Sequence, residues 1–157
     1  MRTAIVGAGA AGLILSKTLL DHGIKPVIFE KSSSVGGVWK YEKRECQENS
    51  ISSPMYDSLL TNLPIYVMEI NSNYPYNETS EFSYIGHKDV LYYLQQYAEN
   101  EELLPYIKFG VAVNSISKEN DSKKWALESI TNGNEVNVDF FDNVVVCNGH
   151  YTVPFTP

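Results

Sequence analysis

A glycine-rich turn between a short apolar run and a helical pattern constrains the fold of this chain more than any other feature. Residues 4–6 are Ala-Ile-Val, and Gly7-Ala8-Gly9-Ala10-Ala11-Gly12 follows directly. Apolar residues then recur at helical spacing up to His22-Gly23, and a second apolar run, 27–29, leads into Glu30. A strand, a glycine turn, a helix, a second strand and an acid in this order are typical of a dinucleotide-binding βαβ unit.

The glycines of this motif have separate tasks. Gly7 allows a sharp turn from strand to helix, Gly9 leaves room for backbone to approach a pyrophosphate, and Gly12 lets the helix pack closely on the strand. The helix that opens near Ala10 and Ala11 presents unpaired N–H groups and the positive end of its dipole. We therefore expect the phosphates of a dinucleotide at this helix start.

The acid at the end of the second strand indicates which dinucleotide is bound. Glu30 lies where a carboxylate accepts hydrogen bonds from both ribose hydroxyls of an adenosine. A phosphate on the 2′ oxygen would meet like charge there, so this site is expected to hold FAD or NAD rather than NADP. The alternative is an α/β turn without a ligand, and the flanking strands and helix favour the nucleotide.

Composition and charge exclude several classes of protein. The 157 residues fit one domain, and 43% hydrophobic with 20% charged residues is typical of a globular chain. The net charge is −7 and basic residues pair only at Lys43-Arg44 and Lys123-Lys124, so nucleic acid and anionic membranes are poor partners. No run is long enough to cross a bilayer, and we expect no signal peptide before the first strand.

The cysteines and the other reactive side chains predict neither a metal site nor a protein nucleophile. Cys46 and Cys147 lie far apart without metal-binding spacing, so we expect free thiols and a cytoplasmic location. The sequence shows no Ser-His-Asp set, metal cluster or carboxylate pair. This is the pattern expected of an enzyme whose cofactor carries the chemistry.

The rest of the chain predicts an α/β fold with a small antiparallel meander. A helix is expected from Gly86-His87 onward, with His87 simply a residue near its start, and residues 65–85 are expected to be irregular. The predicted strands are Ile107–Phe109, which enters a parallel sheet, then a meander of Val111–Ile116, Trp125–Ile130 and Val136–Phe140, and a returning buried strand, Asp142–Cys147.

A glycine pair follows the acid and allows two interpretations. After the polar loop 31–34 the chain reads Val35-Gly36-Gly37-Val38-Trp39. The pair either lets backbone pass close to a second part of the ligand, or it forms a turn ahead of a core tryptophan. Its place directly after Glu30 favours the first.

Taken together, these motifs resemble the amino-terminal part of the flavin-containing monooxygenases. They occur in the family's order and at about its spacing along nearly the whole chain. The matching stretches are 7–13, Glu30-Lys31, Gly36-Gly37-Val38-Trp39, Tyr56-Asp57-Ser58-Leu59-Leu60-Thr61-Asn62-Leu63-Pro64 and Val144-Val145-Val146-Cys147-Asn148-Gly149-His150-Tyr151.

The resemblance implies a set of FAD-binding residues. Those expected at the cofactor are Gly7, Gly9, Ala10, Ala11, Gly12, Glu30, Lys31, Gly36, Gly37, Val38, Trp39, Asn62, Val113, Asn148 and Gly149. Asn62 matches an asparagine beside the isoalloxazine ring; the alternative is an Asx turn before Leu63-Pro64. The backbone near Val113 is expected at the adenine. Where the family has Thr-Gly or Ser-Gly, this chain has Asn148-Gly149, and an amide can still bond the cofactor.

The resemblance also implies the reaction. NADPH would reduce FAD, oxygen would add to flavin C4a, and the hydroperoxide would pass one oxygen to a soft nitrogen or sulfur nucleophile, as with dimethylaniline. The alternatives are a Baeyer-Villiger or N-hydroxylating relative, or a non-catalytic nucleotide-binding fragment. No second GxGxxG occurs between Gly12 and Pro157, so we expect residues 1–157 to be a truncated FAD-binding domain, inactive alone, with the NADPH-binding domain absent.

Overall fold

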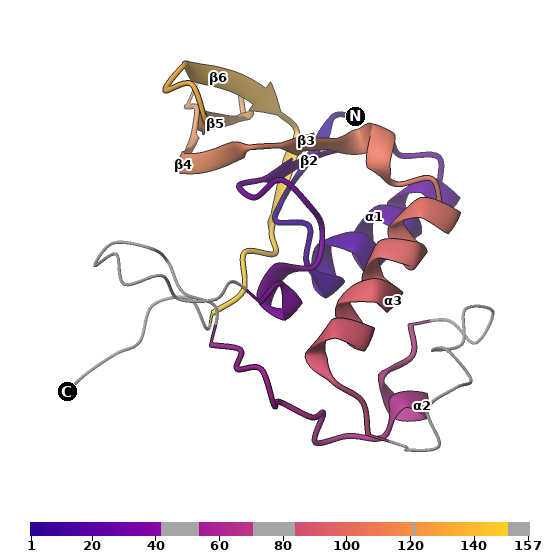
Figure 1. Ribbon diagram of the computed structural model, residues 1–157. Coiled ribbons are helices and arrows are strands. Elements are labelled where there is room, and N and C mark those ends of the chain that lie inside the picture. Colours follow the sequence, from indigo (N-terminus) through magenta and orange to yellow (C-terminus); the bar gives the residue numbers. More distant parts are fainter. Residues whose placement is uncertain (42–53, 71–83, 121, 151–157) are drawn as a thin grey trace.

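Two sheets and two longer helices make up the part of the chain that the computed structural model describes, residues 1–41, 54–70, 84–120 and 122–150 (Figure 1). The strands are β1 (Thr3–Val6), β2 (Pro26–Glu30), β3 (Ile107–Phe109), β4 (Val111–Lys118), β5 (Trp125–Thr131), β6 (Val136–Phe141) and β7 (Asn143–Val146). The helices are α1 (Ala10–Asp21), α2 (Ile65–Met68), α3 (His87–Asn100) and the one-turn 3₁₀ helices η1 (Gly37–Trp39) and η2 (Leu104–Tyr106).

The first sheet is parallel and has the strand order β3-β2-β1-β7. Ala4 faces Val27 of β2 on one side and Val144 of β7 on the other, so β1 lies inside the sheet. Helix α1 connects β1 to β2, which makes these elements the predicted βαβ unit. Because all four strands run the same way, their carboxyl ends lie at one edge, where ligands of such sheets bind.

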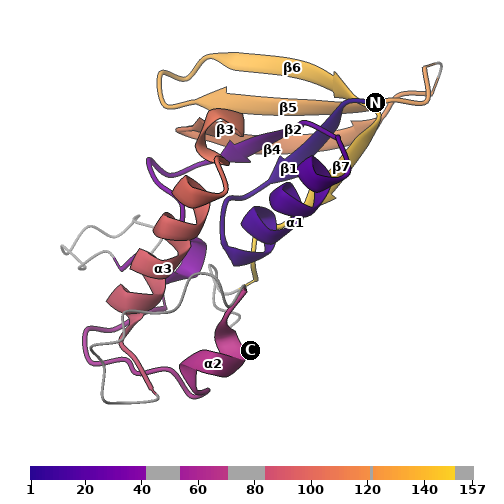
Figure 2. The same ribbon diagram turned by 90° about the vertical axis from the view of Figure 1, so that its right-hand side faces the viewer.

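Side chains of β1 and β2 alternate between two cores. Ile5 and Ile28 pack in a core with α1 and α3, whereas Ala4 and Phe29 pack in a second core with Leu127 and Phe141 of the antiparallel sheet. The antiparallel sheet has the order β4-β5-β6. Figure 2 shows the resulting three layers, with α1 and α3 on one side of the parallel sheet and β4 to β6 on the other.

Helix α3 is amphipathic and covers the parallel sheet with one face. Its buried residues recur three and four apart, at His87, Val90, Tyr93, Leu94, Tyr97 and Ala98. The helix begins where Gly86 donates its N–H to the Asp89 carboxylate over 3.2 Å, which caps the first turn. The sequence therefore predicted the start of α3.

The α/β fold with a parallel sheet and an antiparallel meander is confirmed. The five predicted strands after residue 106 are present with ends within two residues of those expected. The last of them was expected to be buried, which is wrong: β7 lies at the edge of the described sheet, pairs only with β1 there, and three of its four residues are exposed. One difference is α2, a single helical turn at Ile65–Met68 where we expected irregular structure; Pro64 precedes it with φ −60° and ψ 145°. Residues 71–83 and Cys46 lie outside the described residues.

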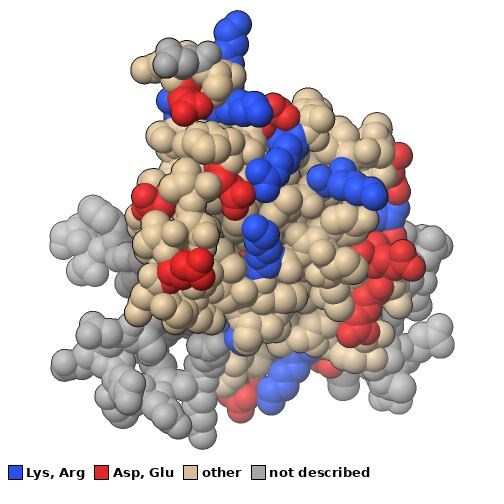
Figure 3. Space-filling view, turned by 90° about the horizontal axis from the view of Figure 1, so that it is seen from above, with Lys and Arg blue, Asp and Glu red and all other residues tan. Residues whose placement is uncertain are grey.

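Charged side chains of both signs lie together on the surface of the described residues (Figure 3). On the face above the antiparallel sheet, Lys and Arg side chains lie close to Asp and Glu side chains (Figure 3). The Asp139 carboxylate, for example, forms ion pairs with Arg2 at 3.0 Å and with Lys108 at 3.7 Å. Among the described residues, no helix has the length and apolar character needed to span a bilayer, and no three His, Cys, Asp or Glu side chains group as metal ligands.

Candidate dinucleotide site

The glycine turn at the end of β1 has the conformation that the motif requires. Gly7 has φ +100°, and a Cβ on it would lie 2.6 Å from the carbonyl oxygen of Cys147. A Cβ on Gly12 would lie 2.0 Å from the carbonyl oxygen of Gly7. Both glycines are therefore required by the protein's own packing, Gly7 by its positive φ and Gly12 by the close seating of α1 on the turn.

Gly9 differs from its two neighbours in the motif. It is the N-cap of α1 with φ −79°, and a Cβ on it would come no closer than 3.5 Å to its nearest neighbour, the Cα of Gly37. Ordinary van der Waals contact at that distance means that the fold itself accepts alanine here.

The start of α1 is open to an anion. The first bond of the helix runs from the Leu13 N–H to the Gly9 carbonyl at 3.0 Å, after the N–H groups of Ala10, Ala11 and Gly12. No side chain caps this end and no acid occupies its first turn. Uncapped N–H groups and the positive end of the helix dipole make this a suitable place for phosphate oxygens.

The glycine pair lies beside the glycine turn, as its position after the acid indicated. The N–H of Gly36 donates to the carbonyl of Ala8 over 3.1 Å. Gly36 and Gly37 have φ of +127° and +56°, and a Cβ on Gly37 would lie 3.0 Å from the Cα of Gly9. The backbones of Gly9 and Gly37 therefore lie close together, and a side chain on Gly37 would press on the backbone of Gly9.

The residues after the pair serve partly as core. Trp39 is half-buried and packs against the core formed with α1 and α3, and Val38 is also half-buried. Lys31, on the other side of the polar loop, is exposed. Trp39 is thus a core residue, as the second interpretation expected, whereas the proximity of the glycine pair to a ligand stays a prediction.

Glu30 is buried at the end of β2 and holds the turn together. The side chain is 6% exposed. Its Oε2 accepts the Ala8 N–H at 2.7 Å, and its Oε1 accepts both the N–H and the hydroxyl of Ser32 at 2.8 Å. A carboxylate has about four acceptor positions, so one remains on Oε2 for a ribose hydroxyl. The bond to Ala8 is a role that the sequence did not indicate.

Asn148 and Gly149 follow β7 at the same edge of the sheet. A Cβ on Gly7 would lie 3.4 Å from the Cα of Asn148, which places this residue against the glycine turn. Gly149 has φ +70° and no atom within 4 Å of the place a Cβ would take. Cys147 is a free, half-buried thiol, and burial raises its pKa, so it stays protonated at neutral pH.

Val113 lies on β4, the strand whose start is joined to the loop that follows Glu30. It is half-buried in β4 and packs against the core between the two sheets. The start of β4 is joined to the loop where the Gly110 N–H donates to the Ser32 carbonyl at 3.0 Å. The structure thus brings β4 to the Glu30 end of the site, on the side where the adenosine was expected.

Asn62 lies on a separate segment that is anchored to the start of α3. The residue is exposed and follows the buried Thr61. The Thr61 N–H donates to the Ile85 carbonyl at 2.9 Å, and the Thr61 hydroxyl accepts the Ile85 N–H at 3.1 Å. The turn at 62–64 leads directly into α2, so the Asx-turn alternative and a cofactor role are both compatible with this geometry.

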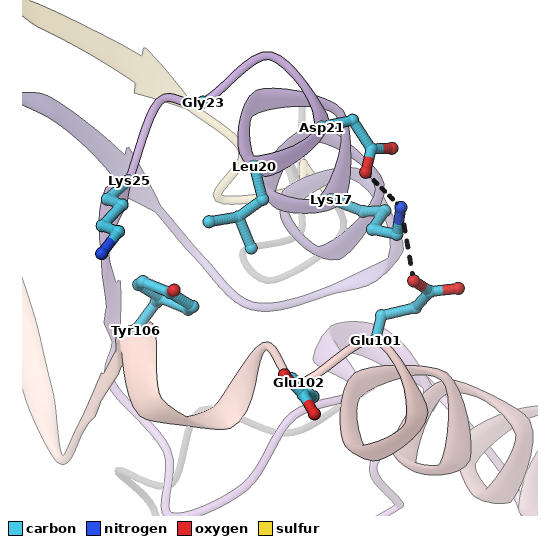
Figure 4. Close-up of a pocket in the computed structure, with 8 residues that line it drawn as sticks. All are labelled: Lys17, Leu20, Asp21, Gly23, Lys25, Glu101, Glu102 and Tyr106. Atoms are coloured by element: carbon cyan, nitrogen blue, oxygen red, sulfur yellow. Dashed lines mark hydrogen bonds and ion pairs between the residues drawn. The ribbon is translucent and has the colours of Figure 1, made fainter.

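A surface pocket exists at the opposite end of the parallel sheet. Lys17, Leu20, Asp21, Gly23, Lys25, Glu101, Glu102 and Tyr106 line it (Figure 4). Gly23 precedes the amino end of β2, whereas the glycine turn follows the carboxyl end of β1. Lys17 bridges Asp21 and Glu101 and thereby ties α1 to α3; the hydrogen bond to Asp21 raises the pKa of Lys17 most. This pocket is distinct from the dinucleotide site.

Comparison with known proteins decides the family. A family model described as flavin-binding monooxygenase-like matches residues 1–157. This chain belongs to that family. Flavin-containing monooxygenase 5 of Mus musculus is 36% identical over 99% of the chain, and the N-oxide-forming dimethylaniline monooxygenase 4 of Homo sapiens is 35% identical over 99%. The chain spans 29% and 27% of these relatives, less than a third of their length.

A solved structure agrees with this assignment. The S-allyl-L-cysteine S-oxygenase of Allium sativum superposes with a TM-score of 0.86 and 34% identity, covering 98% of this chain and 37% of its own. Members of the family use FAD and NADP(H). The family resemblance seen in the motifs is therefore confirmed, and the chain corresponds to an amino-terminal portion.

Proposed function

We propose that the protein is an FAD-dependent, NADPH-using monooxygenase that oxygenates soft nitrogen or sulfur nucleophiles with O2, and that residues 1–157 form its FAD-binding part. The observation that carries the proposal is the uncapped start of α1 at the end of the glycine turn, with Gly9 as the N-cap. Protein packing requires Gly7 and Gly12 but leaves Gly9 unexplained. Membership of a flavin-binding family supports FAD as the ligand.

The residues at this edge of the sheet fit the parts of FAD in order. The N–H groups at the start of α1 would hold the pyrophosphate, and Glu30 would accept a ribose hydroxyl with its remaining position. Val113 lies on β4, whose start is joined to the loop that follows this acid, and would support the adenine. Gly36 to Trp39 and Asn62 would lie along the flavin half.

The chain contributes placement rather than a nucleophile. When bound, the flavin supplies the electron transfer and the oxygen activation. Backbone N–H groups neutralise the phosphates, and the buried Glu30 fixes the shape of the turn that receives them. Because these N–H groups are already in place, the turn does not need to rearrange when the phosphates bind.

The names of the relatives support the substrate class. One is an N-oxide-forming monooxygenase and another is an S-oxygenase, so oxygen transfer to nitrogen or sulfur occurs among proteins about 35% identical to this chain. We propose the same class of small-molecule substrate here. The site for NADPH would lie outside these residues, because only the first glycine motif occurs in them.

Substitution of Gly9 tests the proposal. Gly9→Ala is expected to leave the thermal unfolding temperature of the FAD-free chain within about 2 °C, because the added Cβ keeps 3.5 Å of clearance. It is expected to weaken FAD binding at least tenfold, and Gly9→Val to abolish retention of flavin on desalting. Gly133→Ala, in an exposed turn with ordinary φ, is the control. Equal flavin absorbance in the wild type and Gly9→Val after desalting would refute the site.

Asn62 is proposed as the catalytic amide beside the flavin. In the complete enzyme, Asn62→Ala is expected to retain FAD and lose substrate oxygenation. If the residue only forms an Asx turn, the variant would instead lose thermal stability. Normal oxygenation by a folded Asn62→Ala enzyme would remove Asn62 from the site.

A further inference from the structure

His87 is a buried imidazole without a hydrogen-bond partner among the described residues. It is the first residue of α3 and is 2% exposed. Neither Nδ1 nor Nε2 has a donor or acceptor within reach. At least one of these nitrogens always carries a hydrogen, and leaving such a group unpaired in the interior is unfavourable. Sequence reasoning assigned His87 no task beyond its place at the helix start.

On one side, His87 faces the segment that follows the glycine pair. The His87 and Tyr41 rings lie 5.2 Å apart at 60° in an edge-to-face contact, and Tyr41 comes two residues after η1. One helical turn further, Leu91 closes on Gly36, where an added Cβ would lie 2.3 Å from the Leu91 Cδ1. Residues at i and i+4 share one helix face. This face of α3 therefore lies along residues 36–41.

On the other side, the residue next to His87 is joined to the Asn62 segment. Leu60 and Gly86 form an antiparallel bridge, and Thr61 exchanges two hydrogen bonds with Ile85. Segments 36–41 and 60–62, which both precede α3 in the chain, thus both contact the region where α3 begins. These are the two segments proposed for the flavin half of FAD.

We propose that His87 is a positioning residue for the flavin half of the cofactor. It packs on segment 36–41 next to the residues that anchor segment 60–62, and it gains a hydrogen-bond partner when these segments close around bound FAD. The proposal rests on the proposed function. Because both nitrogens are shut off from solvent in the FAD-free chain, the partner arrives by a local shift of segments 36–41 or 60–62. The adenosine half binds at Glu30 and does not depend on this shift.

The ratio of FAD to ADP affinity separates this role from a merely structural one. His87→Phe keeps a ring against Tyr41 but cannot form a hydrogen bond, and His87→Gln keeps a donor and an acceptor. We expect His87→Phe to weaken FAD binding about tenfold, the value of one hydrogen bond, with ADP binding within twofold of the wild type. We expect His87→Gln to keep the wild-type ratio. Lys88→Gln, at the neighbouring exposed position, is the control.

Stability without ligand gives a second measurement. An unpaired buried imidazole replaced by phenylalanine is expected to leave the thermal unfolding temperature of the FAD-free chain equal or higher. If His87→Phe fails to fold, the FAD-to-ADP ratio of His87→Gln against His87→Leu decides in its place. An unchanged ratio, or an equal loss of FAD and ADP affinity, would overturn the role of His87 while leaving the proposed function intact. A wild-type chain that binds FAD no better than ADP would overturn both.

Discussion

At the scale of single residues, the site depends on groups that serve the fold and the ligand at once. Glu30 illustrates this, since its carboxylate accepts three hydrogen bonds from the glycine turn and from Ser32. The sequence pattern predicted only its contact with ribose. Gly12 also serves the fold, because the absence of a side chain lets α1 pack against the Gly7 carbonyl. Gly9 is the exception that points to a ligand.

Replacement of Glu30 is therefore expected to damage the fold as well as binding. Glu30→Ala removes an acceptor from buried donors on both sides, and hydrogen bonds to a charged group contribute about 1.5–3 kcal/mol each. We expect a loss of at least about 2 kcal/mol in the free energy of unfolding without FAD, measured by urea denaturation, in addition to weaker FAD binding. Glu135→Ala, at an exposed position, is the control. If the Glu30→Ala variant had the same urea midpoint of unfolding as the wild type, the carboxylate would contribute to ligand binding alone.

At the scale of elements, those with a clear period or turn signal could be predicted from the sequence. The alternation in residues 111–140 and the turn residues Asn132-Gly133-Asn134 predicted β4 to β6, and the spacing of Val90, Leu94 and Tyr97 predicted α3. Contacts between distant elements left no such signal. Examples are the bond from Gly36 to Ala8, the contact of Tyr41 with His87 and the bridge between Leu60 and Gly86, which depend on how α3 packs on the sheet.

The packing of α3 on α1 predicts a loss of stability at alkaline pH. Burial, reinforced by the charge of Glu101, raises the pKa of Tyr97 to about 12, against 10.0 for an exposed tyrosine. Between these values the unfolded chain releases the phenolic proton while the folded chain keeps it. Stability contributed by the neutral Tyr97 is therefore full below pH 10 and falls as pH rises toward 12.

Tyr97→Phe tests this, because phenylalanine has no proton to release. The thermal unfolding temperature of the variant is expected to fall less steeply between pH 9.5 and 11 than that of the wild type. Tyr92→Phe, on the same helix but half-exposed, should follow the wild-type curve. Parallel curves for Tyr97→Phe and the wild type would exclude a contribution from this residue.

At the scale of the whole molecule, the described residues contain the binding edge for one dinucleotide and leave apolar strand surface uncovered. β7 pairs with β1 on one side, and its Val145 and Val146 are 37% and 57% exposed. An exposed apolar edge strand favours association with other chains. The chain spans 29% of the length of its mouse relative. We therefore propose that the activity of the whole protein requires residues beyond these.

The 157-residue chain is expected to bind FAD but to show no NADPH-dependent turnover. The turn, Glu30 and β4 provide for the adenosine and pyrophosphate, so affinity for FAD survives. The nicotinamide donor needs a second anion-binding helix start, and no second GxGxxG lies between Gly12 and Pro157. The measurement is NADPH oxidation by the purified chain with excess FAD and a tertiary amine or a thioether, against free FAD and against the Gly9→Val chain. Substrate-stimulated NADPH consumption above both backgrounds would mean that these residues already form a complete monooxygenase, contrary to this proposal.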